Sequence, residues 1–141
     1  MSSDHIVKSF DGELKALNET ILRMGGLAEA QLADAITAIV QRDAELASDT
    51  MREDIKIDAL ETEVDQMAVR LLALRQPMAK DLRSVLAALK ISGAIERIGD
   101  YAANVAKRAI ILADAPPMRP VNGIPRMARM AQRMIKDVLD A

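Results

Sequence analysis

The chain contains no cysteine and no tryptophan, and its one histidine, His5, lies in the N-terminal arm. Without cysteine, the protein can form neither a disulfide framework nor a thiolate metal site. A single histidine in that arm also excludes Ser-His-Asp catalysis, the His-Glu-x-x-His zinc site and the Glu-x-x-His di-iron bundle. These classes of catalytic site are therefore ruled out by composition alone.

Aromatic residues are almost absent as well, because Phe10 and Tyr101 are the only two. Hydrophobic residues nevertheless make up 50% of the 141 residues, which suits one domain with a core. A core of Ala, Leu, Ile, Val and Met favours close helix–helix packing, whereas sheets are rich in β-branched and aromatic side chains. The composition therefore predicts an all-α fold.

Segments that would direct the chain to a membrane or to nucleic acid are also missing. Residues 1–5 have no basic region followed by an apolar run, as a signal peptide would. No uninterrupted apolar run approaches the roughly 20 residues that span a bilayer. The net charge is −2, without a block of like charge, which argues against nucleic-acid binding. We expect a cytoplasmic protein that meets membranes only through its partners.

Apolar residues recur at helical spacing over four segments, which span residues 6–42, 44–74, 78–112 and 124–141. Asp43 can cap the second helix, and Pro77 ends it and can start the third. Residues 114–123 form a Pro-rich linker. The pattern predicts a three-helix unit over residues 1–113, followed by the linker and the first helix of a second unit that the chain does not complete.

Gly25 and Gly26 interrupt the first predicted helix. Each glycine inside a helix costs about 1 kcal/mol relative to alanine. Two interpretations are open: a tolerated bend, or the close approach of a neighbouring helix.

The most unusual feature of the third predicted helix is a pair of carboxylates, Glu96 and Asp100, four residues apart. On a helix this spacing places both on one face, about 6 Å apart along the axis. The pair continues an apolar stripe of Leu82, Val85 and Leu89. The spacing therefore predicts that the two carboxylates point into the bundle.

On the second predicted helix, four of the carboxylates form a row along one face: Asp54, Asp58, Glu61 and Asp65. They fall within about 60° of one another around the helix axis. Like charges at this spacing are mildly destabilising, so a row of four needs compensation by protein cations or by a metal. Carboxylates are hard oxygen donors that suit Mg²⁺, Mn²⁺ and iron. The alternative is that this row is a solvated face and that Glu96 pairs with an arginine such as Arg97.

A basic stripe also follows the third helix, at Arg83, Lys90, Arg97 and Arg108. We interpret it as a solvated face, with a docking surface for an acidic partner as the alternative.

Several motifs occur in a characteristic order: Met24-Gly25-Gly26, Ala44-Glu45-Leu46-Ala47, Arg75-Gln76-Pro77, Asp81-Leu82-Arg83 and Glu96-Arg97-Ile98-Gly99-Asp100, with Ala103-Asn104 behind them. Taken together, they resemble the PhoU family of bacterial phosphate-transport accessory and regulatory proteins. The resemblance implies two similar bundles of three long antiparallel helices in tandem. This chain would contain the first bundle and the first helix of the second.

The resemblance also implies a metal site, because Glu/Asp-x-x-x-Asp motifs hold iron or zinc clusters in some members of the family. Carried onto this chain, the motifs correspond to Glu96 and Asp100 on the third helix and to Asp54 and Asp58 on the second. Manganese and magnesium remain alternative metals. Glu61 and Asp65 repeat the spacing one turn on, so the register on the second helix stays open.

By the same resemblance, the chain is a cytoplasmic regulator of phosphate uptake and a negative regulator of the phosphate-starvation response. It would contact the ATPase subunit of the phosphate ABC transporter and a sensor histidine kinase, would form a homodimer and would not be an enzyme. Asp81, Arg83 and Arg97 are the candidate interaction surface. The alternatives are a metal-dependent bundle enzyme and a metal-free structural bundle.

Overall fold

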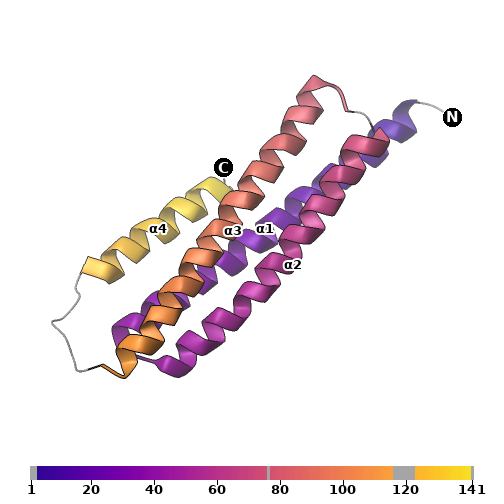
Figure 1. Ribbon diagram of the computed structural model, residues 1–141. Helices are drawn as coiled ribbons and strands as arrows, with labels where there is room; N and C mark the ends of the chain where they lie inside the picture. The colour runs from indigo at the N-terminus through magenta and orange to yellow at the C-terminus, as the bar shows by residue number, and fades with distance from the viewer. Residues whose placement is uncertain (1–2, 76, 116–122, 141) are drawn as a thin grey trace.

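The computed structural model describes residues 3–75, 77–115 and 123–140. These residues form four helices: α1 (Ser3–Gln41), α2 (Ala44–Arg75), α3 (Ala79–Ala113) and α4 (Gly123–Asp140). Helices α1, α2 and α3 run antiparallel and all pack against one another, whereas α4 packs on α1 (Figure 1). No strand occurs among the described residues, and the helix ends lie within a few residues of those predicted.

None of these helices, over the ranges just given, has the length and apolar character needed to cross a membrane.

The turn between α1 and α2 is held by two side chains. Asp43 accepts a hydrogen bond from the backbone N–H of Leu46 at 3.0 Å, which confirms the predicted cap. Arg42 takes a left-handed backbone conformation, with φ of 56°. Its guanidinium donates to the carbonyl oxygen of Leu112, in the last turn of α3, and to that of Ala115, just after the helix. Arg42 therefore joins this turn to the end of α3.

The core of the three-helix bundle has two halves of different composition. The half near the α2–α3 connection, here called the large-residue half, contains the buried residues Phe10, Leu17, Ile21, Met24, Ala28, Ile57, Val64, Ala68, Leu71, Val85, Ala88 and Ile95. The half near the α1–α2 turn, here called the alanine half, contains the buried residues Ala35, Ala38, Ala47, Ala102, Ala106 and Ala109. Because methyl groups take little space, the helices of the alanine half can approach closely.

The buried face of α3 differs from the predicted one. It consists of Val85, Ala88, Ser92, Ile95, Gly99, Ala102, Ala106 and Ala109. Leu82, predicted to be packed, is 37% exposed, and Ile91 is 40% exposed. Small residues occupy the centre of this face. A prediction based on large apolar side chains therefore places the buried face too far around the helix. Glu96 and Asp100 consequently lie half-buried at the edge of the face, not at its centre.

The helical spacing of α2 predicts an apolar seam of Leu60, Val64, Met67, Leu71 and Leu74, and this prediction is also partly wrong. Val64 and Leu71 are buried as expected, but Leu74 is 70% exposed near the end of the helix. Exposed apolar side chains are common on protein surfaces, so their presence alone does not identify the packed face.

Helix α4 explains one of the two glycines in α1. A Cβ on Gly25 would collide with the side chain of Leu139 in α4, whereas one on Gly26 would meet nothing within 4 Å. Close approach of a neighbouring helix is therefore the correct interpretation for Gly25. Gly26 lies against open space.

The helical spacing of α4 predicts a packed face of Met127, Met130 or Ala131, Met134 and Val138, and this prediction is wrong except at Ala131. Met127, Met130 and Met134 are each more than half exposed, and Val138 is 65% exposed. The buried or half-buried residues are Pro125, Ala128, Ala131, Gln132, Ile135 and Leu139. The helix is rotated so that smaller and branched side chains face α1, which lets α4 approach Gly25.

Candidate metal centre

The predicted carboxylates lie where the two halves of the bundle meet. One oxygen from each of Asp54, Asp58 and Asp100 lies within 4.8 Å of the others. Asp54 and Asp100 are half-buried, and Asp58 is exposed. A single cation with oxygen ligands at about 2.0–2.6 Å can contact oxygens that are this close together. The structure thus brings three of the four predicted metal ligands together across the α2–α3 contact.

Glu96, the fourth predicted ligand, lies next to this group. A hydrogen bond with Asp100 raises the pKa of Glu96 to about 7, and burial and the charge of Asp100 act in the same direction. The more distant charges of Glu61 and Asp58 contribute further. Glu96 therefore holds a proton more readily than an ordinary glutamate does, and it adjoins the three-carboxylate group.

The structure distinguishes the two registers left open on α2. Asp54 and Asp58 join Asp100 in the close group, whereas Glu61 and Asp65 do not. Burial raises the pKa of Glu61, with help from the charges of Asp65, Asp58 and Asp100. Glu61 thus extends the same negative field along α2, and Asp65 is exposed.

The charge of the group is not balanced by the described basic side chains. Burial raises the pKa of Asp54, and the charges of Asp58 and Asp100 raise it further. Among the side chains of residues 9–75, 77–115 and 125–140, salt bridges form at Asp49, Glu53 and Glu13, none of which belongs to the group. The alternative pairing of Glu96 with Arg97 is not among them. Protons or a cation can supply the missing positive charge.

Two residues of this site were not predicted from the sequence, namely Gln31 and Gly99. Gln31, on α1, is 2% exposed, and its amide Nε2 donates to the carbonyl oxygen of Thr50 at 3.3 Å. Its Oε1 and the Oδ1 of Asp54 are both buried without a hydrogen-bond partner. A Cβ on Gly99 would lie 3.1 Å from Asp54 Oδ1 and 3.2 Å from Gln31 Oε1. Gly99 therefore leaves open the space that both oxygens face, and these residues fit a bound cation.

A sequence signal for Gln31 does exist. It falls in the helical series Met24, Ala28, Gln31, Ala35 and Ala38, every member of which is buried. A polar side chain in a series of apolar residues indicates either a buried hydrogen bond or a functional site.

The candidate interaction surface lies elsewhere. Asp81 is half-buried in the first turn of α3, and Arg83 and Arg97 are exposed. Arg83 and Arg97 are separated by about 21 Å along the helix axis, from the rise per residue. They therefore do not form one compact site.

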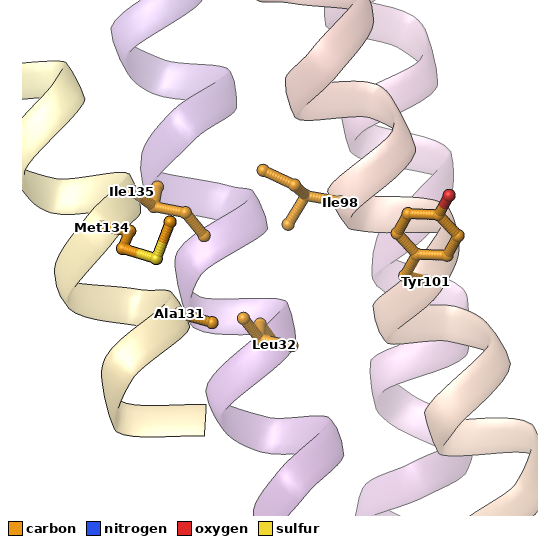
Figure 2. A pocket seen from close by; sticks show the side chains of 6 residues that line it. All are labelled: Leu32, Ile98, Tyr101, Ala131, Met134 and Ile135. Carbon is orange, nitrogen blue, oxygen red and sulfur yellow. The ribbon is translucent and has the colours of Figure 1, made fainter. Parts of the chain in front are cut away.

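A separate apolar pocket of about 320 Å³ is lined by Leu32, Ile98, Tyr101, Ala131, Met134 and Ile135. Figure 2 shows these six side chains, which come from α1, α3 and α4. On α3, Ile98 lies about 160° and Tyr101 about 100° around the helix axis from Asp100, at about 100° per residue. The pocket and the carboxylate group are thus distinct features.

Comparison with known proteins decides the family. A model of the PhoU domain matches residues 21–109, which is more than half of the chain. The chain belongs to the PhoU family. The matched range includes Gln31, Gly99 and the six carboxylates considered above, namely Asp54, Asp58, Glu61, Asp65, Glu96 and Asp100.

Named relatives agree with this assignment. A phosphate-specific transport system accessory protein PhoU homolog of Caulobacter vibrioides (strain NA1000 / CB15N) is 50% identical over 140 residues, which cover 99% of this chain and 61% of that protein. The homolog of Zymomonas mobilis subsp. mobilis is 45% identical over 137 residues, covering 97% of this chain and 58% of that protein. The resemblance inferred from the sequence motifs is confirmed.

A solved structure agrees as well. The crystal structure of PhoU from Pseudomonas aeruginosa is similar with a TM-score of 0.88 and 39% sequence identity, over 94% of this chain and 64% of that one. The predicted PhoU-like bundle of long helices is therefore confirmed. The chain spans about three fifths of the length of the PhoU homologs it matches.

Proposed function

We propose that the chain is a regulatory module of bacterial phosphate uptake. The observation that carries the proposal is its 50% identity, over 140 residues, to a phosphate-specific transport system accessory protein. The module acts in the cytoplasm, as a homodimer, on the ATPase subunit of the phosphate ABC transporter. It also contacts a sensor histidine kinase and restrains the phosphate-starvation response when phosphate is plentiful.

The module acts by protein contact and not by catalysis. Its relatives are named as accessory proteins of a transport system, which supports this part of the proposal. The exposed basic residues Arg83 and Arg97, with Asp81 at the start of α3, form the candidate contact surface.

The carboxylate group contributes a metal site to the module. Asp54, Asp58 and Asp100 would hold the cation, and Glu96 would adjoin it through Asp100. The cation would supply positive charge that offsets the repulsion among these groups and would connect α2 to α3. Oxygen ligands favour magnesium, manganese or iron, and carboxylates also bind zinc.

Co-purification tests the regulatory role. The tagged chain and the full-length Caulobacter homolog are each expressed with the transporter ATPase subunit and with the kinase. We expect both partners to be retained by the chain and by the homolog. Retention by the homolog but not by the folded chain would contradict the assignment of partner contact to this region.

Elemental analysis tests the metal site. The chain is purified without chelator, as is the variant that combines Glu96→Ala with Asp100→Ala. A matched control combines Asp49→Ala with Glu53→Ala, which removes two α2 carboxylates that pair with Arg52 and Lys56. We expect metal in the unchanged chain and in the control but not in the variant. Equal metal content in all three would place the metal elsewhere.

The enzyme alternative is tested on the same metal-loaded sample. The site would be catalytic if this sample showed oxidase or phosphatase turnover that disappears in the Glu96→Ala, Asp100→Ala variant.

A further inference from the structure

Gln31 is a buried amide that is only half satisfied. It is 2% exposed, and it lies on α1 between Ala28 and Ala35, which are fully buried. Burying an amide without hydrogen bonds is costly, so a buried glutamine normally uses both ends of its side chain. Here Nε2 donates to the carbonyl oxygen of Thr50, and Oε1 has no donor.

A second unpaired oxygen lies near that of Gln31. Asp54 Oδ1 is also buried without a partner, and both atoms lie close to the position that a Cβ on Gly99 would take. Two oxygens that share a small dry space repel each other unless a proton or a cation lies between them.

Rotating the amide of Gln31 by 180° does not resolve the conflict. The rotated amide would donate to Asp54, but its carbonyl oxygen would then face the carbonyl oxygen of Thr50. The conflict between two acceptors would move from one end of the side chain to the other. A cation beside Oε1, or a proton on Asp54, resolves it without loss of the bond to Thr50.

We infer that Gln31 is a neutral oxygen ligand of the cation held by Asp54, Asp58 and Asp100. The inference rests on the proposed metal site and extends it from two helices to three, because Gln31 belongs to α1. Amide carbonyl oxygens are common ligands of hard cations alongside carboxylates. Gly99 is the residue that keeps the shared space open, since any larger side chain would fill it.

Binding of Mn²⁺ to the whole chain tests the inference, with free and bound ion distinguished by electron paramagnetic resonance. The variant is Gln31→Leu, which keeps the approximate size of the side chain and removes its oxygen. The matched control is Thr20→Val, which replaces another buried polar residue of α1 that is 2% exposed. Thr20 lies about 16 Å from Gln31 along the helix, from the rise per residue.

We expect Gln31→Leu to weaken Mn²⁺ binding by about tenfold or more, since even indirect support of a metal ligand is worth that much. Thr20→Val should leave the affinity unchanged. The rise in melting temperature on adding Mn²⁺ should shrink in the Gln31 variant and persist in the control.

A second variant, Gln31→Glu, keeps the test decisive if the leucine variant does not fold. It restores an oxygen ligand, so it should bind Mn²⁺ at least as tightly as the unchanged chain at pH 7.5. A residue that only donated its amide hydrogens would show the opposite, because glutamate lacks them and adds repulsion.

The outcomes separate the inference from the proposed site. If the unchanged chain and Gln31→Leu bind Mn²⁺ equally, the metal site stands and the role of Gln31 is wrong. If Thr20→Val weakens binding as much as Gln31→Leu, the effect is general loosening and the role of Gln31 is again wrong. If the unchanged chain binds neither Mn²⁺ nor Fe²⁺ nor Zn²⁺, both the site and the inference fall.

Discussion

The two halves of the bundle core use the same three helices in opposite ways. In the large-residue half, side chains such as Leu17, Met24 and Ile57 are fully buried and fill the space between the helices. In the alanine half, the fully buried side chains are single methyl groups, so the backbones themselves supply the contact surface. The stability of the large-residue half therefore depends on buried apolar area, and that of the alanine half depends on close approach of the helices.

The carboxylate group occupies the junction of these halves. Ile57 on α2 belongs to the large-residue half and Ala102 on α3 to the alanine half, with Asp54 and Gly99 one helical turn from them. The change from large to small side chains leaves room for oxygens of Gln31 and Asp54 beside Gly99. The site therefore depends on both modes of packing.

The largest effect is expected from removing volume in the large-residue half. Leu17→Ala should lower the free energy of unfolding by about 2–5 kcal/mol, because it removes buried area and leaves a cavity. Leu22→Ala is the control, since Leu22 is on the same helix and 51% exposed. Urea unfolding at fixed pH measures both, and equal losses would contradict a core that is concentrated around Leu17.

A smaller loss is expected from adding volume to the alanine half. Ala106 is fully buried, so Ala106→Leu should force the helices apart and cost about 1–3 kcal/mol of unfolding free energy. The exposed Ala87 on the same helix provides the control substitution, because alanine and leucine have similar helix propensity. A gain in stability for Ala106→Leu, again by urea unfolding, would mean that this half is not closely packed.

Substitutions at Gly25 and Gly26 distinguish the contact with α4 from the low helix propensity of glycine. Gly26→Ala should stabilise the chain by about 1 kcal/mol, because glycine is a poor helix former and the site is open. Gly25→Ala should lose that gain, since its methyl group would collide with Leu139 of α4.

A double-mutant cycle measures this collision. In a Leu139→Ala background, Gly25→Ala should recover the gain and match Gly26→Ala in urea unfolding. If Gly25→Ala is as stabilising without the Leu139 change, α4 does not pack against Gly25 in solution.

The last expected effect is the pH dependence of the junction. The pKa of Glu96 is about 7 in the folded chain against an ordinary value of 4.5. Between these values the folded chain retains a proton that the unfolded chain has released, so stability falls as pH rises from 4.5 to about 7. The raised pKa values of Asp54 and Glu61 add in the same direction.

Urea unfolding at pH 5 and at pH 7.5, with chelator present, measures this slope. Glu96→Gln should flatten it, because glutamine does not titrate. Measurements stay above pH 4.5, since the bond with Arg75 lowers the pKa of Glu13 and gives a slope of the opposite sign below that value. A slope that is the same in both proteins would show that the pKa of Glu96 is not raised in the folded chain.

Local sequence determined much of this molecule. The lack of aromatic residues and the helical periodicity predicted the all-α bundle, Asp43 predicted the start of α2, and Pro77 predicted the break before α3. The spacing of Glu96 and Asp100 placed both on one side of α3. These features depend on neighbours in the chain, and the rotation per residue of a helix is the same wherever the helix lies.

Only the tertiary structure decided how the helices are rotated against one another. It turned Gly99 and Ala106 to the centre of the buried face of α3, chose Asp54 and Asp58 over Glu61 and Asp65, and brought Gln31 beside them. Periodicity gives the angle between two residues of one helix but not the angle at which that helix meets its neighbours. That angle is set by how the small residues let three helices approach at once.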